Sequence, residues 1–162
     1  MPKPAARLGD STAHGTPLGG SPGSLNVFIG GKPAWRAIPN AAAAGLGVAK
    51  QITVVTLKSL KAAKVAASGT PAAPAAIAAE QAGIAAAAAS MGAMISGFGG
   101  FSDISVCPVP LPVPPHGPGV VTNGSPTVLV NNMPLARMGD SITEALGPPN
   151  KIVSGCMKVM VK

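Results

Sequence analysis

The sequence predicts a small, mainly β domain, rich in loops, into which an alanine-rich helical hairpin is inserted. Three observations predict this fold class. A short β unit with similar turns recurs three times, proline and glycine are frequent on both flanks of the chain, and alanine dominates residues 37–101. One such unit is too small to bury its own apolar face. Three units are therefore expected to pack around a common axis with three-fold pseudo-symmetry.

The repeated unit consists of a Gly-Asp turn, a loop, a Gly-Ser turn and a short strand. Three alignments define it: residues 24–36 on 125–137, residues 6–11 on 136–141, and, more weakly, residues 154–161 on 123–130. In the first alignment Arg36 falls on Arg137, and a proline stands three residues earlier in both segments.

The repeats divide the chain into three parts. Residues 1–36 form the first β repeat, residues 102–162 form the remaining repeats, and residues 37–101 interrupt the pattern. The chain of 162 residues contains 21 glycines and 18 prolines, but only three phenylalanines, one tryptophan and no tyrosine. This composition indicates a β domain with many turns and a small core.

The insert is expected to form two helices. The first is expected over residues 40–68, with Asn40 as its N-cap and its lysines gathered within about a third of its circumference. Gly69, Thr70 and Pro71 end this helix and turn the chain. The second is expected over residues 74–96, because proline suits the first turn of a helix.

Two interpretations of this hairpin remain open. No charged residue occurs from Ala82 to Phe101, a run of 20 residues that is long enough to cross a bilayer. The first interpretation is therefore a hairpin that inserts into a membrane. The second is a hairpin that packs on itself or on a partner protein, because alanine is only weakly apolar and lysines oppose insertion of the first helix.

Charge and cysteine content restrict the function classes. The net charge is +7, but the basic residues are scattered and no aromatic platform accompanies them, so no nucleic-acid partner is expected. No signal-peptide pattern follows Met1, which predicts a protein made in the cytoplasm. The two cysteines, Cys107 and Cys156, do not form a CxxC motif, and in the cytoplasm a metal site is favoured over a disulfide.

Candidate metal ligands occur on segments with similar surroundings. His14 and His116 each precede a glycine and lead toward a Gly-Ser turn. With Cys107, which lies on a proline-rich stretch expected to form stiff loops, they supply the nitrogen and sulfur ligands that Zn²⁺ prefers. The fourth ligand is open. Glu144 falls on His14 when the Gly-Asp turns are aligned, whereas Cys156 offers a thiolate but occupies a turn position typical of a structural role.

Three short segments together resemble the motifs of one protein family. Residues 33–36 (Pro-Ala-Trp-Arg) and 134–137 (Pro-Leu-Ala-Arg) are similar to a Pro-Ala-Ala-Arg signature, and residues 5–14 are similar to an Ala-Ala-Arg-x-x-Asp-x-x-x-His motif. These are the PAAR and prePAAR motifs of PAAR-repeat proteins, which form the pointed tip of the type VI secretion spike. The resemblance covers about residues 4–36 and 102–162.

The resemblance implies a small β-cone with a zinc ion near its apex, in the N-terminal region of a PAAR or Rhs-type effector. It implies that one copy caps the trimeric valine-glycine-repeat (VgrG) spike and that a small acidic Eag-type chaperone covers the apolar helices before export to the target cell envelope. The family's zinc ligands fall on His14, His116 and Cys107. Many relatives carry a further histidine just before the cysteine, and residues 103–106 contain none.

The expected function is mechanical: a rigid tip that sharpens the spike and carries effector cargo. An enzyme is not expected, because a catalytic zinc needs an open coordination position and a general base, and no substrate cleft is indicated. A membrane-active carrier, in which the β part only supports the helices, is the other alternative. The last repeat ends close to Lys162, which leaves open a complete tip or the first part of a longer effector with a toxin domain.

Overall fold

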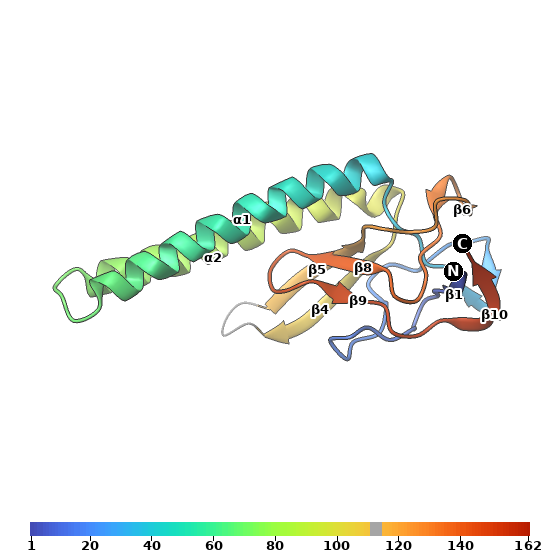
Figure 1. The fold of residues 1–162 in the computed structure, drawn as a ribbon, viewed down its shortest axis with the longest axis horizontal. Helices are drawn as coiled ribbons and strands as arrows, with labels where there is room; N and C mark the ends of the chain where they lie inside the picture. The colour runs from blue at the N-terminus through green and yellow to red at the C-terminus, as the bar shows by residue number, and fades with distance from the viewer. Residues whose placement is uncertain (111–114) are drawn as a thin grey trace.

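The computed structural model describes residues 1–110 and 115–162, which form a β domain and one long helical hairpin (Figure 1). The helices are α1 (Asn40–Ala67) and α2 (Ala73–Ser96), and α2 continues into the 3₁₀ turn η1 (Gly97–Gly100). In the described residues the strands are β1 (Lys3–Ala5), β2 (Phe28–Ile29), β3 (Lys32–Pro33), β4 (Ile104–Pro110), β5 (Pro115–Val121), β6 (Leu129–Val130), β7 (Met133–Pro134), β8 (Ser141–Glu144), β9 (Asn150–Lys151) and β10 (Cys156–Val161). A curled β sheet with two helices agrees with the predicted mainly β fold and is consistent with a β-cone.

The helix ends follow local sequence signals. Pro39 is extended, with φ −60° and ψ 150°, and α1 begins at the next residue. The prediction that Asn40 is the N-cap is therefore wrong by one position, because the proline ring sets the geometry that a cap requires. The chain reverses at Gly69, which has a φ of +76° that few other residues adopt. Pro74 lies in the first turn of α2, as predicted.

The main sheet is antiparallel, with the strand order β4-β5-β8-β9. The prediction of stiff loops around the metal-ligand candidates is wrong, because Cys107 lies on β4 and His116 on β5. Proline excludes a helix, but its φ of about −65° suits an extended strand. The prolines of β4 have no backbone N–H to donate. An edge strand with a register shift between Cys107 and Pro110 tolerates this loss. The predicted stretch also includes residues 111–114, which lie outside the described residues.

Two tight hairpins occupy equivalent positions in the aligned segments 24–36 and 125–137. In β2–β3, Phe28 pairs with Pro33, and β6–β7 has the same register. Their turns are Gly30-Gly31, with φ of +57° and +80°, and Asn131-Asn132, with φ of +52° and +62°. Two successive residues with positive φ are typical of the type I′ turn, which follows the natural twist of a hairpin.

The third copy of the unit is completed by the other end of the chain. β10 pairs with β1, so that Met160 lies opposite Pro4. Pro4 thus takes the position that Pro33 holds in β3, and residues 4–7 have the sequence Pro-Ala-Ala-Arg. Sequence reasoning aligned Ala6 and Arg7 with Ala136 and Arg137 and placed residues 5–7 in the prePAAR motif. It did not find this third hairpin, because its two strands are at opposite ends of the chain.

A ring of backbone hydrogen bonds joins the three segments that carry these signatures. The Ala6 N–H donates to Ala136 O at 2.8 Å, the Ala136 N–H to Trp35 O at 2.9 Å, and the Trp35 N–H to Ala6 O at 3.0 Å. The ring closes on itself. The side chains of these residues belong to one buried core cluster at its centre.

The arginine that ends each of these three Pro-Ala-Ala-Arg-like segments binds an aspartate in the same way. The pairs are Arg7–Asp10, Arg36–Asp103 and Arg137–Asp140, and in each the arginine backbone N–H, Nε and Nη2 donate to the carboxylate. The first and third pairs are three residues apart, whereas 67 residues separate the second pair. The helical hairpin is therefore inserted within this Arg–Asp turn.

The root of the hairpin packs on the main sheet. Leu46, Met91 and Ile95 are buried in one cluster with Val120 of β5 and with Ala145, which follows β8. From this root the hairpin extends along the sheet and beyond it, away from the chain termini (Figure 1). By length and composition alone, residues Ala73–Gly100 would suffice to cross a membrane, and 11% of their most apolar window is buried.

Candidate metal centre

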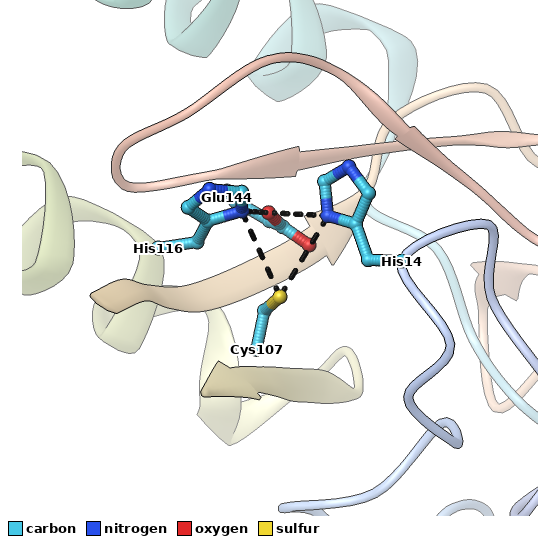
Figure 2. A group of neighbouring side chains, drawn as sticks. All are labelled: His14, Cys107, His116 and Glu144. Atoms are coloured by element: carbon cyan, nitrogen blue, oxygen red, sulfur yellow. Dashed lines mark hydrogen bonds and ion pairs between the residues drawn. The ribbon is translucent and has the colours of Figure 1, made fainter. Parts of the chain in front are cut away.

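Four metal-binding side chains converge at one place in the β domain: His14, Cys107, His116 and Glu144. Figure 2 shows them pointing toward one another from separate segments. One ligand atom from each lies within 4.8 Å of the others. Cys107, His116 and Glu144 are buried and His14 is half-buried, so the centre is enclosed on most sides.

The separations suit a tetrahedral ion. Cys107 Sγ lies 3.7 Å from Nδ1 of His14 and 3.7 Å from Nδ1 of His116. Glu144 Oε2 lies 2.7 Å from Nδ1 of His116 and 3.1 Å from Nδ1 of His14. Ligands around a tetrahedral zinc with bonds of about 2.0–2.3 Å are separated by about 3.3–3.8 Å. The sulfur–nitrogen distances match this range, and the carboxylate oxygen needs only a small outward shift.

Strand pairing brings three of the candidate ligands together. β5 lies between β4 and β8, so Cys107 and Glu144 approach His116 from opposite sides. Gly119 pairs with Glu144, and a Cβ at Gly119 would lie 2.9 Å from Glu144 Cγ. A Cβ at Gly147 would lie 2.6 Å from His116 Nε2. These two glycines leave the space that the ligand side chains occupy, a role that the sequence alone did not reveal.

His14 comes from a loop that β9 holds in place. The backbone N–H of Ala13 donates to Lys151 O at 2.8 Å, and the N–H of His14 donates to Asn150 Oδ1 at 3.2 Å. Thr12 forms an isolated β-bridge with Ile152. Three successive loop residues are thus tied to the segment 150–152, and this fixes the approach of the His14 imidazole.

Burial controls the protonation of the thiol. Burial raises the pKa of the Cys107 thiol, the Glu144 carboxylate raises it further, and a hydrogen bond from the Val109 backbone acts in the opposite direction. The thiol therefore holds its proton at neutral pH in the absence of a metal. A bound cation has to displace that proton, which couples metal binding to pH.

A lysine from α1 reaches the strand that carries Glu144. Lys50 Nζ donates to Glu144 O at 2.8 Å and to Ala145 O at 3.1 Å. Burial lowers the pKa of Lys50, and the Glu144 carboxylate partly offsets this effect. The contact links the root of the helical hairpin to the metal centre.

The two candidates for the fourth ligand lie in different surroundings. Glu144 joins His14, Cys107 and His116 within one group, whereas Cys156 packs in an apolar cluster with Ile29 and Val130. Sequence reasoning also missed a residue beside the centre. Asn150 Nδ2 donates to Glu144 Oε1 at 2.7 Å. An asparagine in a two-residue strand carries no motif, so this contact had no signal in the sequence.

A comparison with protein families supports a PAAR-repeat protein. The PAAR motif model matches residues 113–162, a segment that contains His116 and Glu144 and covers less than a third of the chain. Neither the curated proteins nor the solved structures contain a match to the chain.

Proposed function

We propose that this protein is a structural tip of a type VI secretion spike, a zinc-stabilised cone that caps the VgrG trimer and carries effector cargo. The observation that carries the proposal is the closed ring formed by residues 4–7, 33–36 and 134–137. Each segment donates to the next in the same way, and each leads into the same kind of Arg–Asp pair. These contacts support a three-fold pseudo-symmetry that would match a trimeric partner from a single chain.

An apolar surface supports docking at the end of the molecule that carries the termini. Phe28, Leu129 and Met160, here called the basal triad, are 59%, 59% and 52% exposed. They occupy equivalent hairpin positions, opposite Pro33, Pro134 and Pro4. The residues that follow them are buried in the core, so the strand alternation directs the triad outward. Three similar apolar side chains in equivalent positions fit a partner with three identical subunits.

A zinc ion at His14, Cys107, His116 and Glu144 would stiffen this small domain. The donor set of two imidazoles, one thiolate and one carboxylate is typical of Zn²⁺ and not of Mg²⁺ or Ca²⁺, which prefer oxygen ligands. The four ligands all come from protein side chains, as in a closed structural site. Such a site offsets the limited core of a small β domain, because a metal bound only by the folded chain stabilises it.

The route of this protein follows from the proposed role. We infer that it is made in the cytoplasm and exported, one copy per spike, to the envelope of a target cell. The apolar helix α2 remains largely uncovered, with 11% of its most apolar window buried. That surface supports either cover by an Eag-type chaperone before export or insertion into a membrane after it.

Binding to a purified VgrG trimer tests the proposal. We expect the wild-type protein to co-elute with the trimer at one chain per trimer, and Phe28→Glu combined with Leu129→Glu to abolish co-elution, because two carboxylates would be buried in the interface. Ile52→Glu is the matched control, since Ile52 is 62% exposed and lies on α1, outside the three hairpins that carry the triad. Equal binding by the triad variant and the control would overturn the docking face.

A membrane-active carrier is the second candidate function, and the length and apolarity of residues Ala73–Gly100 favour it. In that case the full chain would bind liposomes whether or not the basal triad is intact, and would not bind the trimer. Co-sedimentation with liposomes, measured beside the trimer assay, separates the two functions.

A further inference from the structure

Asn150 is a buried polar residue whose contacts point to two of the metal-ligand candidates. Its side chain is 2% exposed and lies at the start of β9. Its Nδ2 donates to Glu144 Oε1 at 2.7 Å, and its Oδ1 accepts from the backbone N–H of His14 at 3.2 Å. One amide group therefore connects the ligand of β8 with the loop that carries the ligand from the N-terminal repeat.

The contact with Asn150 makes the two oxygens of the Glu144 carboxylate different. Oε1 is occupied by the Asn150 amide, while Oε2 faces Nδ1 of His14 and of His116. Only Oε2 is directed toward the centre, so the carboxylate would supply one oxygen and not two. One oxygen, one sulfur and two nitrogens make a closed four-coordinate site, whereas a two-oxygen carboxylate would raise the coordination number to five.

The contact with the His14 backbone restrains the loop that carries this residue. His14 is only half-buried and lies on a loop, so its imidazole would be the most mobile of the four ligands. The hydrogen bond from its N–H to Asn150 Oδ1, next to the bond between Ala13 and Lys151, holds this loop against β9. The donor and acceptor halves of one amide thus restrain two ligands that are far apart in the sequence.

We propose that Asn150 is the positioning residue of the metal centre: it holds Glu144 as a one-oxygen ligand and fixes the loop of His14. This inference rests on the metal site in the proposed function. Both contacts require an amide side chain at this position. An aspartate could still accept the hydrogen bond from the His14 N–H, but it would have no N–H to donate to Glu144 Oε1. It would also add a second negative charge beside that carboxylate.

Asn150→Asp therefore separates the two contacts and is the main test. Full-length wild type and variant are loaded with Co²⁺, whose visible absorption is strong in four-coordinate sites and weak in five-coordinate ones, and with Zn²⁺ in competition with a chelator. We expect the strong absorption in the wild type, a clear loss of intensity in the variant, and a zinc affinity about 10- to 100-fold lower, as for other residues that support metal ligands.

Asn123→Asp is the matched control. It makes the same charge change, and Asn123 Oδ1 accepts a hydrogen bond from the backbone N–H of Ser141, which lies on the same strand as Glu144, but Asn123 has no bond to Glu144 itself. We expect its cobalt spectrum and zinc affinity to equal those of the wild type. Asn150→Ala, which adds no charge, gives a second reading by the same spectrum if the aspartate variant does not fold.

The outcomes distinguish the inference from its premise. A wild-type protein that binds neither ion would overturn the metal site itself. A wild type with the four-coordinate spectrum, together with Asn150 variants that keep its spectrum and affinity, would overturn the positioning role alone. A change in the control as large as that in Asn150→Asp would assign the effect to added charge and also overturn that role.

Discussion

Single residues divide into those of the candidate metal centre and those that hold the repeats together. Asp140 illustrates the second group, because its fully buried carboxylate receives three hydrogen bonds from Arg137. Asp10 and Asp140 belong to the Gly-Asp turns of the repeat alignment, and the carboxylate of each accepts the backbone N–H of the residue three positions earlier. The same carboxylates also bind the guanidinium of that residue, and this charge-assisted contact, which is stronger than the turn contact alone, had no signal in the alignment.

The two cysteines give a prediction at this scale. Cys107→Ser is expected to reduce bound zinc from about one ion per chain to a small fraction, because a hydroxyl is a much poorer zinc ligand than a thiolate. Cys156→Ser is the matched control and should keep its zinc, since Cys156 packs among Ile29 and Val130 and not at the centre. Elemental analysis of the purified proteins measures both. Zinc loss from the Cys156 variant alone would reverse the ligand assignment.

At the scale of elements, the helical hairpin has a packed root and a distal part that contacts mainly itself. The root residues Leu46, Met91 and Ile95 are buried against the sheet. Farther out, a Cβ at Gly83 would lie 2.2 Å from Leu60 Cδ1, and Lys64 forms an ion pair with Glu80. These distal contacts join the two helices to each other.

This division predicts the result of shortening the hairpin. Replacing residues 59–85 by a short glycine-rich turn should leave the zinc content and the melting temperature of the β domain close to those of the full chain.

Removal of residues 40–101 should also leave the ligands in place, but it uncovers Val120 and Ala145 and is expected to cost about 2–5 kcal/mol in unfolding free energy. Elemental analysis and chemical unfolding measure both effects. Loss of zinc on shortening would show that the distal hairpin belongs to the metal centre.

At the scale of the whole molecule, closure depends on contacts between distant parts of the chain. β1 and β10 join the two ends, and the metal-ligand candidates connect His14 with Glu144. The buried core is divided into three small clusters among the described residues and contains one tryptophan, Trp35. A domain of this kind gains much of its rigidity from cross-links between segments.

Removal of the metal tests this dependence. A chelator should lower the melting temperature of the zinc-loaded protein, and the loss should correspond to several kcal/mol of unfolding free energy. Because burial raises the pKa of the Cys107 thiol, metal release returns a proton to it. Zinc affinity should therefore fall at least about tenfold for each unit that the pH decreases below neutrality, since histidine ligands also bind zinc only in the neutral form. Melting curves with and without chelator at several pH values measure both. An unchanged melting temperature would contradict a structural metal.

The sequence by itself determined the elements that depend on neighbours along the chain. Alanine between Pro39 and Pro71 defines α1, and its observed end at Ala67 differs by one residue from the prediction. The segments that the repeat alignment pairs, 24–36 and 125–137, adopt equivalent turns at residues 30–31 and 131–132. Histidine and cysteine also identified the candidate ligands His14, Cys107 and His116, because few other side chains bind zinc. Each of these signals is local, since propensity, turn geometry and ligand chemistry belong to a few residues.

Only the tertiary structure decided what depends on contacts between distant residues. It joined Arg36 to Asp103 across the hairpin, completed β10 with β1, and brought Glu144 and not Cys156 to the centre. It also showed that the proline-rich segments predicted as loops are extended strands, because β4 and β5 pair with each other and neither segment alone reveals that pairing. The physical reason is that strand register and the meeting of side chains arise from packing between segments. Arg36 and Asp103, which are 67 positions apart, form no motif in the sequence and meet only when the chain folds.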